Sequence, residues 1–393
     1  MVEAPSSSHH ESVSSGPGPS VAIVGAGVIG LSVAWRLAAA GCRVRVFDRG
    51  AAGRGATHAA GGMLAACVET EPGEEGLLPL TRDSQARWPA FAAGLEAASG
   101  LPVDLRDEGT MVIALNADDA AKLRFLHDFQ SGLGLPVEWL GGAELRRREP
   151  YLQPGVAGGL FCRDDHQVDN RKLAAALLAA VRRAGGEVHE GAEVTRIEVR
   201  GGRAVGLVVG DRLVEADRVV LAAGAWSGGI DGLPAAARPP VRPVKGQMLC
   251  LRMDARLPLL RHVVWTPGTY LIPRRDGRLL IGATTEERGF DDRLTAGGQF
   301  ALLEGAWRAL PGIAELPIEE SWAGFRPGSR DDAPILGPSG VDGLVHATGH
   351  HRNGILLAPV TADTIAALVL TGEVDPVIRP FALDRFRPSG AAA

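Results

Sequence analysis

The chain has 393 residues, of which 46% are hydrophobic and 22% charged, a composition typical of a globular protein long enough for two domains. Its net charge of −5, with no patch rich in Lys or Arg, argues against a nucleic-acid or anionic-membrane partner. The four cysteines lie far apart, without CxxC or Cys/His spacing. This pattern argues against a structural zinc site and favours reduced thiols.

Both ends of the chain are expected to lie outside the fold. Residues 1–19 are rich in Ser, Gly and Pro and predict a disordered tail, and residues 388–393 are expected to fray. The apolar run at 21–40 is not a signal peptide or membrane span, because Arg36 interrupts it and no basic cluster precedes it. We therefore expect a cytoplasmic protein with no membrane partner.

The first structured unit is a strand, a glycine-rich turn, a helix and a second strand that ends in Asp48. Gly25, Gly27 and Gly30 form a GxGxxG turn, which predicts a site for the diphosphate of a dinucleotide at the start of the helix. In this pattern Gly25 permits the tight turn, Gly27 lets the backbone approach the phosphates, and Gly30 allows close packing of helix and strand. Asp48 would accept hydrogen bonds from ribose hydroxyls.

Small residues follow at 55–64, where large side chains would block a planar ligand. Beyond them, the hydrophobic pattern predicts helices and strands in alternation. Predicted helices span 82–98, 117–133, 142–149, 169–185 and 354–370. Predicted strands span 109–115, 187–199, 204–209, 218–227, 248–253, 269–273, 279–284 and 344–349.

This alternation predicts an α/β fold of two interleaved domains. The cofactor domain would consist of residues 20–76, 154–239 and 321–387, and a second domain with an antiparallel sheet would consist of 77–153 and 240–320. No internal repeat is present.

Three polar residues in otherwise apolar stretches are candidates for ligand binding. Arg326 and Arg352 have small or apolar neighbours, and no nearby run of acids offers either an obvious partner. Burying a cation without a partner is costly, so each arginine either binds an anion or forms a structural salt bridge with a distant acid. Tyr270, one of only two tyrosines, either contacts that anion or is a half-buried strand aromatic.

Motifs along most of the chain, from residue 20 to 387, resemble the FAD-dependent D-amino acid oxidase and sarcosine oxidase superfamily. They are GAGVIG at 25–30, ATHAAGGML at 56–64, VVLAAGAWS at 219–227 and GHHRNGILLAP at 349–359. Within this superfamily, PVKGQML at 243–249, TYLIPRRDGRLLIGAT at 269–284 and WAGFRPGSRDDAPILG at 322–337 resemble glycine oxidases of the thiamine-biosynthesis type.

The resemblance implies an FAD-binding Rossmann-like domain of the glutathione-reductase type, interleaved with an α+β substrate domain. FAD is expected to be noncovalent, because the region 325–330, where a covalent branch of the superfamily attaches its flavin, contains no cysteine. The residues that match the family's FAD contacts are Gly25, Gly27, Val28, Ile29, Gly30, Asp48, Arg49, Thr57, His58, Gly62, Met63, Leu64, Val194, Gly224, His350, His351, Arg352, Asn353, Gly354, Ile355 and Leu356.

The same resemblance implies that Tyr270, Arg326 and Arg352 bind the substrate carboxylate, with Arg352 in bidentate geometry. Hydride would pass from the α-carbon of glycine, sarcosine or a small D-amino acid to the flavin, with no catalytic protein base. Dioxygen would reoxidise the flavin to give hydrogen peroxide, and the imine would feed thiazole synthesis. The alternatives are a dehydrogenase that passes electrons to a quinone or carrier, and an FAD-binding scaffold without turnover.

Two further expectations accompany this interpretation. Lys245 either assists oxygen activation near the flavin or is simply salt-bridged. The resemblance also implies a homo-oligomer, and no metal is expected.

Overall fold

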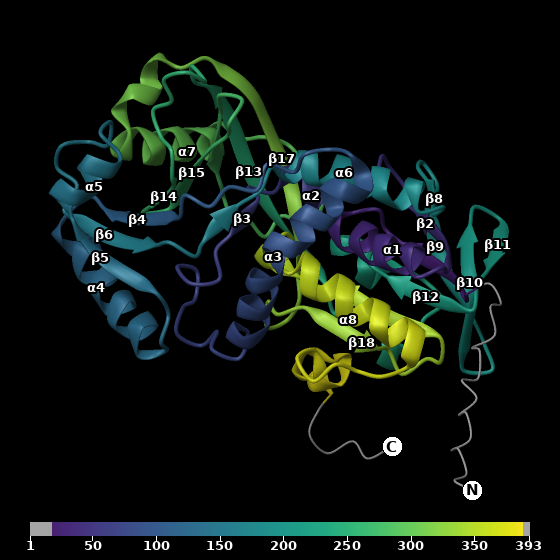
Figure 1. The fold of residues 1–393 in the computed structure, drawn as a ribbon. Helices are drawn as coiled ribbons and strands as arrows, with labels where there is room; N and C mark the ends of the chain where they lie inside the picture. Colours follow the sequence, from purple (N-terminus) through teal and green to yellow (C-terminus); the bar gives the residue numbers. More distant parts are fainter. Residues whose placement is uncertain (1–17, 388–393) are drawn as a thin grey trace, which may run out of the picture.

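The structure, a computed structural model, describes residues 18–387. The predictions for residues 1–17 and 388–393 lie outside these described residues. Figure 1 shows two lobes, one containing α1, α3, α6 and α8 and the other containing α4, α5 and α7. Within the described chain, no helix has the length and apolar character needed to cross a bilayer.

The first lobe is built on a six-stranded sheet in the order β18-β19-β12-β1-β2-β8. Its strands pair in parallel except for β18 and β19, which are antiparallel. The strands are β1 (Ser20–Val24), β2 (Arg43–Phe47), β8 (Glu187–His189), β12 (Arg218–Leu221), β18 (Ile335–Pro338) and β19 (Leu344–Thr348). The helices of this lobe are α1 (Val28–Ala39), α3 (Leu78–Ser99), α6 (Asn170–Arg183) and α8 (Ala358–Thr371).

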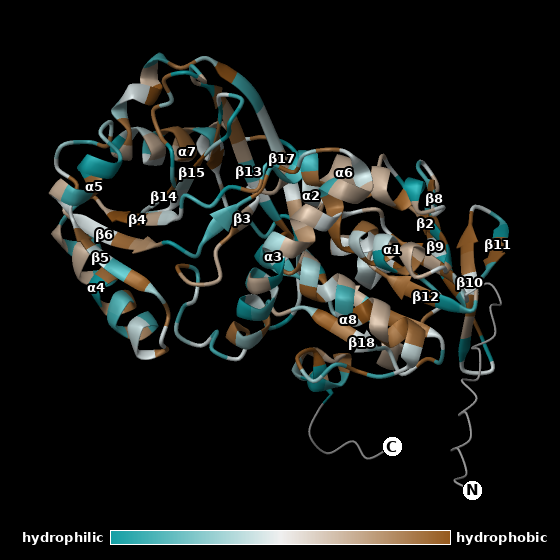
Figure 2. Ribbon diagram, in the orientation of Figure 1, coloured by the Kyte–Doolittle hydropathy of each residue, from teal (hydrophilic) through white to brown (hydrophobic). Residues whose placement is uncertain are grey.

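Apolar burial explains why α1 and α8 pack beside this sheet. Both helices are apolar on nearly all sides, and Leu31, Leu37 and Ile365 are completely buried in one core with Ile23 of β1. Figure 2 shows hydrophobic residues in β12 and along parts of α8. This core fixes the position of the turn between β1 and α1.

The second lobe is an eight-stranded sheet in the order β17-β13-β16-β15-β14-β4-β6-β5. Neighbouring strands are antiparallel except for the parallel pair β14 and β4. The strands are β4 (Thr110–Ala114), β5 (Val137–Gly141), β6 (Gly158–Cys162), β13 (Arg242–Arg252), β14 (Val263–Thr266), β15 (Thr269–Pro273), β16 (Arg278–Gly282) and β17 (Ile318–Gly328). The helices are α4 (Ala117–Gly132), α5 (Gly142–Arg148) and α7 (Ala296–Ala309).

Smaller elements complete the fold. They are α2 (Ala56–Ala59), the two-stranded sheet of β3 (Met63–Leu64) and β7 (His166–Gln167), and the antiparallel sheet of β9 (Val194–Arg200), β10 (Arg203–Val209) and β11 (Arg212–Glu215). Short 3₁₀ helices span Gly224–Gly229, Ala235–Ala237, Pro311–Glu315, His351–Asn353, Arg379–Phe381 and Leu383–Phe386.

The predicted α/β class is confirmed. The list of predicted elements is wrong at 187–199, and it omits α7 and several strands, among them β5, β6, β14, β17 and β18. The single strand predicted at 187–199 is two strands in different sheets, because Gly191, at φ +66°, turns the chain between β8 and β9. Helix α7 was not predicted. Its buried residues Leu302, Ala306 and Ala309 cover the eight-stranded sheet, but three glycines within it weaken the helical pattern in the sequence.

The domain boundaries remain a proposal. Sheet membership differs from the predicted boundaries at two places, since β6 and β17 both pair within the eight-stranded sheet. We therefore propose that the second domain includes β6, and that most of β17 belongs to it as well.

Candidate cofactor and substrate site

One cavity of about 950 Å³ is lined by residues from both lobes. Its walls come from the turns after β1 and β12, the loop from β2 to β3, strands of the eight-stranded sheet, and the loop before α8. The predicted residues that line it are Gly25, Gly27, Val28, Ile29, Asp48, Arg49, Thr57, Gly62, Met63, Val194, Gly224, Tyr270, Arg326, His350, His351, Arg352, Asn353, Gly354, Ile355 and Leu356. A volume of this size is ample for a large organic ligand.

The three glycines of the first turn have different surroundings. A Cβ on Gly25, which has φ +102°, would overlap the carbonyl of Ala222, and a Cβ on Gly30 would overlap the carbonyl of Gly25. A Cβ on Gly27 would meet only Thr57 Oγ1, at 3.4 Å, because this glycine faces the cavity. Gly30 therefore serves packing and does not line the cavity, whereas Gly27 leaves the wall open for a ligand.

The start of α1 offers hydrogen-bond donors beside this open wall. The N–H of Val28 donates to Thr57 Oγ1 at 2.8 Å, and the first turn of a helix has further N–H groups without helical acceptors. Asp48 accepts from the backbone N–H groups of Ala26 and Gly50, at 2.8 and 2.9 Å, which leaves lone pairs for ribose hydroxyls. The open wall, the helix start and the carboxylate together fit a dinucleotide.

Besides Gly30, two of the predicted cofactor residues, His58 and Leu64, do not line the cavity, and their contact with a cofactor stays a prediction. Successive strand residues point to opposite faces, so Met63 faces the cavity while Leu64 is completely buried in the core. The ring of His58 lies edge-on to Trp322, with centroids 6.5 Å apart. Burial, and then the charge of Arg171, lower the pKa of His58 to about 4.

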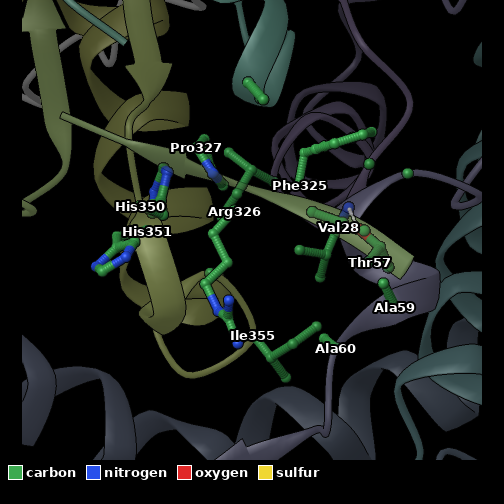
Figure 3. Close-up of a pocket in the computed structure, with 18 of the residues that line it drawn as sticks. Val28, Thr57, Ala59, Ala60, Phe325, Arg326, Pro327, His350, His351 and Ile355 are labelled. Carbon is green, nitrogen blue, oxygen red and sulfur yellow. Dashed lines mark hydrogen bonds between the residues drawn. The ribbon is translucent and has the colours of Figure 1, made fainter. Parts of the chain in front are cut away.

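Arg326 extends into the cavity from β17 (Figure 3), toward Ile355. Its Nη1 donates to the carbonyl of Thr284 at 3.1 Å, and no ion pair to Arg326 occurs among the described residues. A Cβ on Gly246 of β13 would lie 2.6 Å from Nη1, so this glycine provides the space that the guanidinium occupies. Donors of Arg326 therefore remain available for an anionic ligand.

Tyr270 lies next to Arg326 and beside Trp265, a residue that sequence reasoning missed. The two aromatic rings are paired across the β14–β15 hairpin with centroids 4.9 Å apart, and both residues line the cavity. Burial raises the pKa of Tyr270, so its hydroxyl stays protonated. Among the described residues, this hydroxyl makes only a weak hydrogen bond, to Met248 Sδ at 3.5 Å. Trp265 Nε1 is buried and has no hydrogen-bond partner within residues 18–387. The hairpin pattern WTPGTY contained the signal for this pair.

Arg352 has acidic partners that the sequence did not indicate. Its Nη2 donates to Glu74 at 2.7 Å, and its Nε lies 3.2 Å from Glu69. Glu69 also lines the cavity, and burial raises its pKa to about 7. Both acids lie in the loop that precedes α3, about 280 positions away in sequence, which explains why no local run of acids marked them. Arg352 therefore forms ion pairs and also lines the cavity, so both alternatives for its role stay open.

The histidines of the last loop are neutral at physiological pH. Burial lowers the pKa of His350 to about 3 and that of His351 to about 4, and His350 Nε2 lies 3.1 Å from Thr361 Oγ1. Figure 3 shows both imidazoles beside the cavity.

Lys245 does not line the cavity. Its Nζ donates to the carbonyl of Arg293 at 2.6 Å and lies 3.6 Å from Glu286, which favours the salt-bridged alternative.

All four cysteines belong to the described residues, and none of them lines the cavity. This arrangement agrees with a noncovalent cofactor.

Comparison with known proteins identifies the fold and the cofactor. Residues 20–368 match the family model described as FAD dependent oxidoreductase. The chain is 38% identical over 368 residues to a glycine oxidase of Geobacillus kaustophilus, covering 93% of this chain and 96% of the relative. The crystal structure of glycine oxidase from that organism superposes with a TM-score of 0.84 at 36% identity, covering 93% of this chain and 99% of the other.

A second type of relative is longer. The chain is 37% identical over 369 residues to the bifunctional protein ThiO/ThiG of Trichormus variabilis, covering 93% of this chain but only 55% of the relative. The chain therefore spans about half the length of that bifunctional protein. The family match covers most of the chain and includes all the residues that line the cavity, so this chain belongs to the FAD-dependent oxidoreductase family.

Proposed function

We propose that this protein catalyses the FAD-dependent oxidative deamination of glycine to the imine, which hydrolyses to glyoxylate and ammonia, with dioxygen as electron acceptor and hydrogen peroxide as product. The observation that carries the proposal is that one cavity contains both the dinucleotide-binding wall and a group of hydrogen-bond donors suited to a carboxylate. The similarity to glycine oxidases over 93% of the chain supports this substrate.

The donors suit the carboxylate of a small amino acid. Arg326 offers a charged fork that has no ionic partner in the part of the chain that the structure describes, and Tyr270 and Trp265 each offer a polar hydrogen nearby. Arg352 would complete this clamp once the substrate carboxylate competes with Glu74. These contacts hold the α-carbon in one place, and positioning of this kind supplies much of the rate of such a reaction.

The bound FAD would accept a hydride from the α-carbon and pass the electrons to dioxygen. The substrate amine must be neutral, because its lone pair assists departure of the hydride. The protein residues described here bind and orient the substrate, and none is assigned as a base.

We further propose that the imine feeds thiazole assembly and that the protein acts in the cytoplasm as a homo-oligomer. The similarity to a bifunctional ThiO/ThiG protein supports the first of these proposals.

The decisive experiment is an anaerobic screen of flavin bleaching with glycine, sarcosine, small and bulky D-amino acids, and a 2-hydroxy acid. Glycine is expected to bleach the flavin without oxygen and to generate peroxide in its presence. A flavin that only a bulky D-amino acid or a 2-hydroxy acid reduces would refute the substrate assignment. Reduction by glycine without peroxide formation in air would instead indicate a dehydrogenase.

A further inference from the structure

Four side chains form a cluster beside the cofactor wall of the cavity: three of them stack, and the fourth contacts the stack edge-on. The guanidinium of Arg49 lies 3.9 Å above the ring of Trp226, and Phe290 stacks on Trp226 with centroids 5.0 Å apart and an interplanar angle of 14°. Phe325 contacts both rings edge-on, at 6.1 and 5.4 Å. Arg49, Trp226 and Phe325 line the cavity, and Arg49 directly follows Asp48, the predicted ribose acceptor.

Phe290 differs from the other three because it does not itself line the cavity. It lies in the segment 284–295, between β16 and α7 of the eight-stranded sheet, whereas Trp226 follows β12 of the six-stranded sheet. The side chain is 48% exposed, so burial in a core does not account for its position. Its stacking partner is Trp226, which itself lines the cofactor cavity.

The segment 284–295 is held firmly at both ends by buried residues of β13. Near its start, Lys245 and Glu286 exchange backbone hydrogen bonds of 2.9 Å, and near its end Lys245 Nζ donates to the carbonyl of Arg293. Gln247 repeats this arrangement, since its side chain binds Glu286 and Thr295 at 2.8 and 3.0 Å. Lys245 is only 1% exposed and Gln247 is fully buried. Two buried polar side chains thus fix the loop ends, and its middle projects over Trp226.

We propose that the segment 284–295 is a cofactor clasp, in which Phe290 presses Trp226 and Arg49 against bound FAD and slows its release. Lys245 is then a positioning residue that acts through the loop. The inference depends on FAD binding, which the family establishes, and does not depend on the identity of the amino acid substrate.

The test is to measure FAD binding to apoprotein by quenching of flavin fluorescence, and FAD release by stopped-flow dilution, without any amino acid. Phe290→Ala is expected to raise the dissociation constant about five- to tenfold, mainly through faster release, because an aromatic stacking contact is lost. Phe290→Trp should restore the wild-type value. Phe300→Ala is the matched control, because Phe300 is also an exposed phenylalanine, at 67%, but lies on α7 away from this stack.

A second variant tests the anchor. Lys245→Met is expected to accelerate FAD release in the same direction, and circular dichroism would verify that the variant is folded. Unchanged FAD release in both Phe290→Ala and Lys245→Met would overturn the proposal, as would an equal effect in Phe300→Ala. If FAD binding changed as expected while glycine failed to bleach the flavin, the clasp would stand and only the proposed substrate would fall.

Discussion

Replacing Glu74 with glutamine is expected to lower the KM for glycine, because Glu74 occupies donors that the substrate carboxylate requires. Both carboxylate oxygens of Glu74 lie 2.7 to 2.8 Å from Arg352 Nη2. Both side chains of this pair are 32% exposed, so the interaction is screened by solvent and contributes about 0.2 to 1 kcal/mol. Removing the competing charge should therefore lower KM by up to about fivefold, with kcat unchanged.

Steady-state peroxide production over a range of glycine concentrations would measure this effect. Glu75→Gln is the matched control, because Glu75 belongs to the same loop but accepts from the backbone of Gly73 instead of binding Arg352. A KM that rises in Glu74→Gln would show that Glu74 orients Arg352 for the substrate, and the competition argument would be refuted. An equal fall in Glu75→Gln would attribute the effect to the general charge of the loop.

Arg326→Ala and Arg352→Ala should each lower kcat/KM by the equivalent of about 2 to 4 kcal/mol. Arg352→Lys should recover only part of the lost activity, because an ammonium group lacks the planar fork of a guanidinium. Near wild-type kinetics in both alanine variants, with FAD still bound, would show that the arginines are structural. Gly27→Ala should yield a folded apoprotein, whereas Gly30→Ala should lower the yield of folded protein. The two differ because a Cβ at Gly30 overlaps the backbone, and a Cβ at Gly27 does not. Circular dichroism measures folding and flavin absorbance measures bound FAD in each variant. Glu69 has a pKa raised from 4.5 to about 7, so its contribution to stability is present below pH 4.5 and lost as pH rises through about 7. Glu69→Gln should remove this loss of unfolding free energy, which is at most about 3 kcal/mol. Urea unfolding of the wild type and the variant at pH 5 and pH 8 measures the effect. The same pH dependence of stability in both proteins would contradict the prediction.

Local sequence was sufficient for the dinucleotide wall but not for the substrate side. The turn at Gly25 to Gly30 and the strand ending at Asp48 are contiguous elements, so spacing alone predicted their arrangement. The partners of Arg352 lie in a loop far away in sequence, and only the packing of α3 against α8 brings them together. Likewise, the space around Arg326 depends on Gly246 of the neighbouring strand, a cross-strand relation that no periodicity reveals. Long-range pairing therefore limited the prediction of the site more than that of the fold.

The ionisation of the cavity has a direct consequence for pH dependence. His350 and His351 are neutral above about pH 4, and Tyr270 stays protonated because burial raises its pKa. The cations that face the substrate region are arginines, whose charge does not change in the working range. Anion binding by Arg326 should therefore be nearly independent of pH. A rise of kcat/KM with pH would then reflect deprotonation of the substrate amine. Near neutrality Glu69 becomes ionised beside Arg352, and its negative charge would weaken binding of the substrate carboxylate and so reduce this rise.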